Sequence, residues 1–136
     1  MKNRKTMYKV GIVFGAYNPV HFGHIRLLEK TSKICKKVYA ITESDSILLR
    51  EKGVKPFVSQ KKRVHDLEGI KYVTKAYCRT NKKDRLYWIR KLKPDVLILG
   101  SDYRHKNWIG KTYGIKIVYF PRTPGISSTF LRETIK

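Results

Sequence analysis

Acidic side chains are scarce in this sequence. Its 136 residues include 10 Asp and Glu against 31 Lys and Arg, which leaves a formal net charge of +21. Such an excess attracts polyanions, so nucleic acid, anionic membrane surfaces and phosphorylated small molecules are all candidate partners. Lysine-rich usage also arises from AT-rich coding bias, which explains the charge equally well without a functional cause.

Cysteine is rare, and long apolar runs are missing. Cys35 and Cys78 are too few for a disulfide scaffold or a four-cysteine zinc site, so both thiols are expected to be reduced and buried. No apolar run approaches the roughly 20 residues that cross a membrane, so no membrane insertion is expected. The basic opening leads only into "VGIVFGA", which we interpret as a strand rather than a signal peptide. A cytoplasmic protein with a single domain over residues 1–136 is therefore expected.

Strand and helix patterns alternate along the chain. Short apolar runs predict strands over 8–14, 37–42, 71–78, 94–100 and 114–120. Helical periodicity predicts helices over 24–37, 59–70, 81–92 and 127–136. Ser59 and Asn81 are candidate N-caps, and the polar stretch 43–58 is predicted to be a loop. The alternation predicts an α/β fold, a Rossmann-like, doubly wound, five-stranded parallel sheet with helices on both faces.

Ligands of such sheets bind beyond the carboxyl ends of the strands. The loops that follow the predicted strands are therefore the candidate binding segments. They span residues 15–24, 43–58, 100–108 and 121–128. Every distinctive motif of the chain falls in one of these loops, which favours a binding site at this edge of the sheet.

The first of these loops lies in "FGAYNPVHFGHIRLL", residues 14–28. His21 and His24 stand three residues apart at a predicted helix start, so they share one side of the helix. As metal ligands they would need further partners, and no nearby cysteine or carboxylate suggests one. A purely structural role stays open. Phosphate contact is favoured, because Gly15 and Gly23 allow close approach and a helix N-terminus attracts anions.

Three ordered motifs resemble one enzyme family. The run His21-Phe22-Gly23-His24 resembles the H-x-G-H signature of nucleotidyltransferases of the cytidylyltransferase superfamily. The segment "FPRTPGISSTFLRETI" (120–135) is similar to the closing signature of the glycerol-3-phosphate cytidylyltransferase group. The segment "DVLILGSDYRHK" (95–106) is similar to the strand, Gly-x-Asp-aromatic run and lysine of the same group. Together the motifs cover the chain almost end to end.

The resemblance implies an enzyme that joins a nucleoside triphosphate to a phosphorylated alcohol and releases pyrophosphate, without a covalent enzyme intermediate. It implies four catalytic residues, His21, His24, Lys55 and Arg122. It implies nucleotide contacts at Phe14, Gly15, Ala16, Gly23, Gly100, Asp102, Tyr103, Lys106, Arg122, Thr123, Ile126, Ser127, Ser128 and Thr129. Acceptor contacts are implied at Lys55 and Arg63.

A purely structural role is the alternative for several of these residues. Asp102 can be a turn cap, and the run from Ser127 to Thr129 can be a helix cap. Lys55 and Arg63 stand in a lysine-rich run that can simply be a solvated surface. Triphosphate chemistry implies Mg²⁺, which the nucleotide would bring, because no acidic cluster in the sequence is dedicated to it and no protein metal ligand is expected.

The sequence departs from the family pattern at the nucleotide loop. The group usually reads G-T-F-D where this chain has Gly15-Ala16-Tyr17-Asn18. "NPVHFGH" and "ISSTFLR" are also close to nicotinate and nicotinamide mononucleotide adenylyltransferases, and "KPDVLILGSDY" resembles the domain that activates heptose phosphate with ATP. CTP with glycerol 3-phosphate is the first expectation and ATP with another phosphorylated acceptor the second. A basic nucleic-acid-binding module without catalysis is the third expectation. The family resemblance also implies a homodimer.

Overall fold

A computed structural model describes residues 7–100 and 113–121 of the chain. The strands are β1 (Tyr8–Phe14), β2 (Cys35–Glu43), β3 (Lys75–Arg79), β4 (Val96–Gly100) and β5 (Lys116–Phe120). The helices are α1 (Phe22–Ile34), α2 (Asp45–Lys52), α3 (Gln60–Glu68) and α4 (Arg85–Leu92). The helix predicted over 127–136 lies outside the described residues. Of the helices in the described ranges none could cross a membrane, and α1, with 13 residues, falls short of the roughly 20 that a crossing needs.

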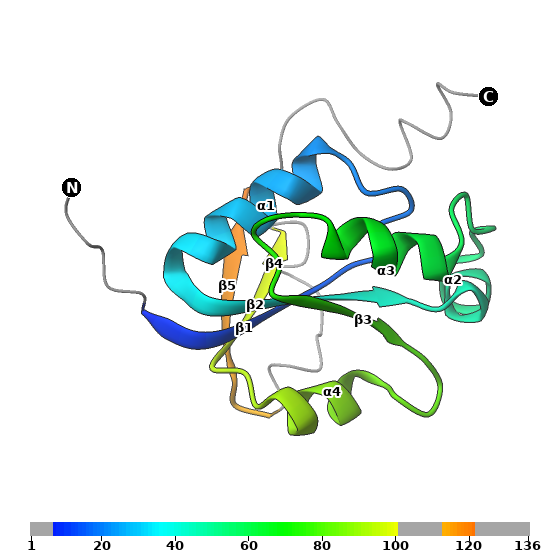
Figure 1. The fold of residues 1–136 in the computed structure, drawn as a ribbon. Coiled ribbons are helices and arrows are strands. Elements are labelled where there is room, and N and C mark those ends of the chain that lie inside the picture. Colours follow the sequence, from blue (N-terminus) through cyan, green and yellow to red (C-terminus); the bar gives the residue numbers. More distant parts are fainter. Residues whose placement is uncertain (1–6, 101–112, 122–136) are drawn as a thin grey trace.

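The five strands form one parallel sheet in the order β3-β2-β1-β4-β5. From β1 the chain moves outward through β2 to β3, and then returns to place β4 on the other side of β1 (Figure 1). The predicted doubly wound parallel sheet is confirmed. The reversal creates a switch point between β1 and β4, the place where open α/β sheets bind ligands.

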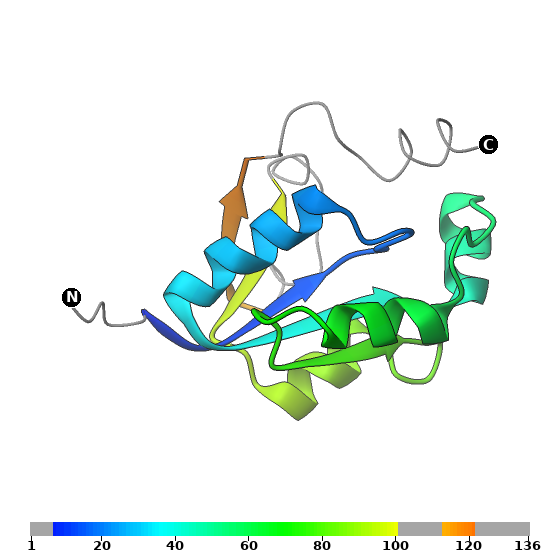
Figure 2. The same cartoon turned by 45° about the horizontal axis from the view of Figure 1, so that its top comes forward.

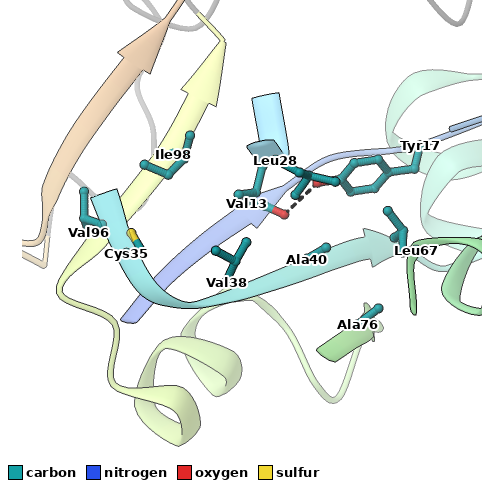
Figure 3. Close-up of a cluster of buried hydrophobic side chains, with 10 residues drawn as sticks. All are labelled: Val13, Tyr17, Leu28, Cys35, Val38, Ala40, Leu67, Ala76, Val96 and Ile98. Atoms are coloured by element: carbon teal, nitrogen blue, oxygen red, sulfur yellow. Dashed lines mark hydrogen bonds between the residues drawn. The ribbon is translucent and has the colours of Figure 1, made fainter. Parts of the chain in front are cut away.

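Helices cover both faces of the sheet, as predicted. Both views place α1 and α3 on one face and α4 on the other (Figures 1 and 2). Under α1 and α3 a buried cluster joins Leu28 and Leu67 to side chains of the central strands, among them Val13 and Ala40 (Figure 3). On the opposite face, the buried cluster consists of Ile12, Ile41, Trp88, Ile89, Leu97 and Leu99. Each fully buried side chain of this size contributes about 1.5–3 kcal/mol, so the two clusters hold the helices on the sheet.

The connection from α1 to β2 differs from the prediction. The helical pattern extends to residue 37, but α1 ends at Ile34 and Cys35 opens β2 in an extended conformation. Cys35 pairs with Tyr8 of β1, and a Cβ on Gly11 would lie 2.5 Å from its Sγ. Gly11 thus makes room for the thiol, and strand pairing overrides the helical pattern. Both cysteines are free thiols. Cys35 is buried as expected, whereas Cys78 is only half-buried.

The stretch 43–58 is not all loop, because it contains α2. The Ser44 side chain caps this helix by accepting from the Ile47 N–H at 3.2 Å. Ile47 and Leu48 are buried, and Gly53 ends the helix with φ +62°. Two buried apolar residues are too few to show helical periodicity, so the pattern predicted only a loop here.

Two further boundaries were wrong. Asp84, not Asn81, caps α4 by accepting from the Tyr87 N–H at 2.9 Å, while Asn81 accepts a hydrogen bond from Arg50. The strand predicted over 71–78 begins at Lys75, where pairing with β2 starts. Pairing with a distant strand decides the start of β3, whereas a local side-chain cap decides the start of α4. Ser59 caps α3 as predicted.

Arg63 on α3 is fully buried despite its charge. Its guanidinium donates five hydrogen bonds of 2.5–2.9 Å at the carboxyl edge of the sheet. The acceptors are the carbonyl oxygens of Ala16, Glu43 and Val58, the Thr42 hydroxyl and the Asp45 carboxylate. One side chain therefore fixes the loop after β1, the end of β2 and the segment before α3 against one another.

We expect Arg63→Met to lower the free energy of unfolding by about 3–5 kcal/mol, because it leaves buried acceptors without donors. The matched control is Lys61→Met, two residues away on the same helix and exposed, which should change stability by less than about 0.5 kcal/mol. Urea unfolding followed by circular dichroism measures both. Equal effects of the two substitutions would contradict the role assigned to the guanidinium.

Candidate functional site

The loop after β1 leaves the sheet at the switch point. Phe14 ends β1 and Gly100 ends the neighbouring β4, so both lie at the carboxyl edge. The Gly15 N–H donates to the Ile41 carbonyl oxygen at 3.1 Å, which ties the loop to β2. A Cβ on Gly15 would lie 3.1 Å from the Tyr17 ring, so glycine lets this ring pack inward.

Tyr17 is the inner anchor of this loop. Its side chain is buried, its φ is +50°, and its hydroxyl donates to the Val13 carbonyl oxygen at 3.0 Å (Figure 3). The ring also packs against His24, with centroids 4.7 Å apart. Through these contacts the loop folds back over β1 and connects it to the start of α1.

His21 and His24 cap α1 reciprocally. The Gly23 N–H donates to His21 Nδ1 at 3.0 Å, and the His21 N–H donates to His24 Nδ1 at 3.1 Å. This is a capping box built from two imidazoles. A nitrogen that accepts a hydrogen bond carries no proton, so each neutral ring is protonated at Nε2. The backbone thus selects the tautomer in which Nε2 is a hydrogen-bond donor.

The two imidazole rings stack with centroids 3.8 Å apart, and His24 is half-buried. Burial, with a smaller contribution from the neighbouring His21 charge, lowers the pKa of His24 to about 3. His24 is therefore neutral at physiological pH. It can donate a hydrogen bond to an oxyanion at the helix N-terminus, but it cannot act there as a cation.

Lys55 and Arg63, the predicted acceptor contacts, have different environments. Lys55 is exposed on the loop between α2 and α3. The Arg63 guanidinium is occupied by the protein acceptors described above, which gives no support to a contact with an acceptor phosphate. Its predicted role stays a prediction, and its observed position is that of a support for the loop that contains Ala16.

Asn18 was noticed in the sequence only as a departure from the family pattern. Its side chain is buried, and Oδ1 accepts from the Phe57 N–H at 2.8 Å and the Val58 N–H at 2.9 Å. It therefore joins the loop that contains the histidines to the loop that contains Lys55. No sequence signal could show this contact, because it links positions 39 and 40 residues apart.

A buried carboxylate borders the site at the end of β2. Burial raises the pKa of Glu43, but the Lys52 charge and the Arg79 hydrogen bonds lower it more strongly, so the net pKa lies below its ordinary value. The Arg79 Nη2 donates to Glu43 Oε2 at 2.8 Å. Glu43 is thus an ionised structural group. Within residues 7–100 and 113–121, no three His, Cys, Asp or Glu side chains gather where they could hold a metal ion.

The other half of the predicted site lies outside the described residues. It comprises Asp102, Tyr103, Lys106, Arg122, Thr123, Ile126, Ser127, Ser128 and Thr129. The structure thus brings together Phe14, Gly15, Ala16, Gly23 and the two histidines around the loop after β1, with Gly100 at the end of the adjacent strand.

Comparisons with known proteins identify the family of the chain. The family model described as cytidylyltransferase-like matches residues 12–134. The chain is 32% identical over 128 residues to glycerol-3-phosphate cytidylyltransferase of Bacillus subtilis, covering 91% of this chain and 95% of that protein. It is 29% identical to the bifunctional protein HldE of Desulfatibacillum aliphaticivorans, covering 98% of this chain and 28% of that protein.

A solved structure shows the same fold. The lipopolysaccharide core biosynthesis protein of Thermoplasma volcanium superposes with a TM-score of 0.71 at 23% identity, covering 85% of this chain and 98% of that one. The family match spans most of the sequence, and the Bacillus subtilis relative is matched over nearly its whole length. The chain therefore belongs to the cytidylyltransferase-like family and is a nucleotidyltransferase.

Proposed function

We propose that the protein transfers a cytidylyl group from CTP to a small phosphorylated alcohol, with glycerol 3-phosphate as the first acceptor to test. An acceptor phosphate oxygen attacks the α-phosphorus of CTP and forms a new P–O bond. The bond between the α-phosphorus and the oxygen that bridges to the β-phosphorus breaks, and pyrophosphate leaves with the electron pair. The similarity to glycerol-3-phosphate cytidylyltransferase over nearly its whole length supports this choice.

One observation supports the site more than any other. The capping box holds His21 and His24 at the N-terminus of α1, beside the switch point, with the proton of each neutral ring on Nε2. These donors and the positive end of the helix dipole are fixed before substrate arrives. Groups of this kind stabilise charge that develops on a phosphate in the transition state without reorganising.

Positive charge has to come from other residues, because His24 is neutral. By the family resemblance, Arg122 would bind phosphate near the departing pyrophosphate, and Lys55 would reach the triphosphate or the acceptor. The exposed position of Lys55 leaves its ammonium group accessible to an anion. Mg²⁺ would enter with the triphosphate, whose oxygens are the hard ligands that it prefers.

An ATP-dependent adenylyltransferase is the second candidate. The observation that favours it is the similarity to HldE, together with "NPVHFGH", which resembles adenylyltransferases that use nicotinate or nicotinamide mononucleotide. Both reactions would use the same histidines in the same way, so the phosphate chemistry does not separate them. The base and the acceptor have to be determined by experiment.

The choice between these candidates can be made with a substrate panel. We expect pyrophosphate release with Mg²⁺, CTP and glycerol 3-phosphate, and slower or no release with ATP, GTP or UTP. Inorganic pyrophosphatase converts the released pyrophosphate to phosphate, which is measured colorimetrically. Mass spectrometry identifies the product. Turnover confined to ATP with a mononucleotide or sugar phosphate would establish the second candidate, and no turnover with any pair would contradict both.

We expect His24→Gln to lower kcat by about 10²–10³ while the free energy of unfolding changes by less than about 1 kcal/mol. Glutamine is a usual capping-box residue at this position, so the helix cap survives while the imidazole Nε2–H is lost. The control is His65→Gln on α3, whose side chain is 88% exposed and which should leave kcat unchanged. A fully active His24→Gln enzyme would show that the imidazole has only a structural role.

The neutral state of His24 predicts a specific pH dependence of stability. An unfolded histidine binds a proton near pH 6.5, whereas folded His24 does so only near pH 3, so protonation favours the unfolded chain between these values. Stability should therefore fall as the pH drops below 6.5, by about 1 kcal/mol per pH unit more in the wild type than in His24→Gln. Urea unfolding of both proteins at pH 7.5, 6.0 and 5.0 measures this difference. Parallel pH dependences would contradict the assigned state.

A further inference from the structure

The segment that bears Lys55 is held at both ends. On one side the Gly53 N–H donates to the Leu49 carbonyl oxygen and the Val54 N–H donates to the Leu48 carbonyl oxygen, both on α2. On the other side the Phe57 and Val58 N–H groups donate to Asn18. Only Lys55 and Pro56 lie between the two attachments, and proline allows little change in φ.

The second attachment is made by the buried side chain of Asn18 and is supported by Arg63. Asn18 Oδ1 accepts two N–H groups at 2.8 and 2.9 Å, and the Val58 carbonyl oxygen accepts from Arg63 Nε at 2.8 Å. Asn18 is 1% exposed, so water does not compete for these hydrogen bonds. The backbone that follows Lys55 is therefore joined to the loop that precedes His21.

We propose that Asn18 is a positioning residue that places Lys55 relative to His21 and His24. This inference rests on the proposed function, in which Lys55 contacts a substrate phosphate while the histidines contact the α-phosphate. Asn18 stands three residues before His21 and binds the backbone two residues after Lys55. Through this contact the two phosphate-binding loops behave as one rigid unit, which fixes the distance between the attacking phosphate and the α-phosphorus.

The departure from the G-T-F-D pattern is consistent with this role. An aspartate at position 18 could accept the same two N–H groups through a carboxylate oxygen. The position thus requires an acceptor directed at residues 57 and 58, and both side chains supply one. Alanine supplies none, so Asn18→Ala and Asn18→Asp form a matched pair of variants.

The attachment itself is tested by amide hydrogen exchange in the protein without substrates. We expect the Phe57 and Val58 amides to be protected in the wild type and in Asn18→Asp, and to exchange at least tenfold faster in Asn18→Ala. Should Asn18→Ala fail to fold, Asn18→Ser, whose shorter oxygen cannot reach both amides, gives the same comparison. If the Phe57 and Val58 N–H groups of the folded Asn18→Ala or Asn18→Ser variant exchange as slowly as in the wild type, the proposal is overturned.

The functional part is tested by a double-mutant cycle with Lys55. We expect Asn18→Ala to lower kcat/KM for the acceptor by about ten- to hundredfold in the wild-type background, and by less than about threefold in Lys55→Ala. In the Asn18→Asp background, replacing Lys55 by alanine should lower kcat/KM for the acceptor as much as it does in the wild type. Equal effects of Asn18→Ala in both backgrounds would mean that Asn18 does not act through Lys55, and would overturn the proposal.

The two experiments separate failure of this inference from failure of the proposed function. If the wild type releases no pyrophosphate with any substrate pair, the proposed function fails, and with it the assignment of Lys55, whatever the exchange data show. If the wild type is active and the cycle is additive, the proposed function stands and only the role of Asn18 is overturned.

Discussion

The carboxyl edge of the sheet keeps its shape because one guanidinium satisfies the backbone carbonyl groups that the strands leave there. Parallel strands end in loops whose polar groups have no ladder partners, and buried groups of this kind are costly when unpaired. Arg63 donates to Ala16, Glu43 and Val58, which belong to three different segments. The nucleotide loop, the end of β2 and the approach to α3 therefore depend on one side chain from the first turn of α3.

Local patterns predicted the central part of this fold well. The run Tyr8–Phe14 and the run before Gly100 are rich in apolar residues, and both form parallel strands with buried residues at their centres. Prediction failed where a distant contact decided the outcome, as at Cys35, which pairs with β1 instead of ending a helix. The short helix α2 was missed because its apolar positions, Ile47 and Leu48, are too few to show a period.

In the candidate site, too, local features could be predicted from the sequence and contacts between distant residues could not. His21 and His24 could be found from the sequence because their spacing and the adjacent glycines are local features. Their mutual capping, and therefore their tautomer, depends on φ and ψ at the helix start, which no motif records. The family resemblance implied an acceptor contact for Arg63, and its basic run also allowed a solvated surface. Its burial against Asp45 and three carbonyl groups arises only when α3 docks on the sheet. Asn18 became meaningful only through its partners 39 and 40 residues away.

The capping box also determines how the site responds to transition metals. To bind zinc or nickel through Nε2, an imidazole must offer a lone pair there and move its proton to Nδ1. In His21 and His24, Nδ1 already accepts a backbone N–H, so the moved proton would face another proton. Metal capture would then break both hydrogen bonds of the cap and loosen the first turn of α1. Two histidines three residues apart, an arrangement that attracts such ions elsewhere, are here chemically protected against them by the backbone of their own helix.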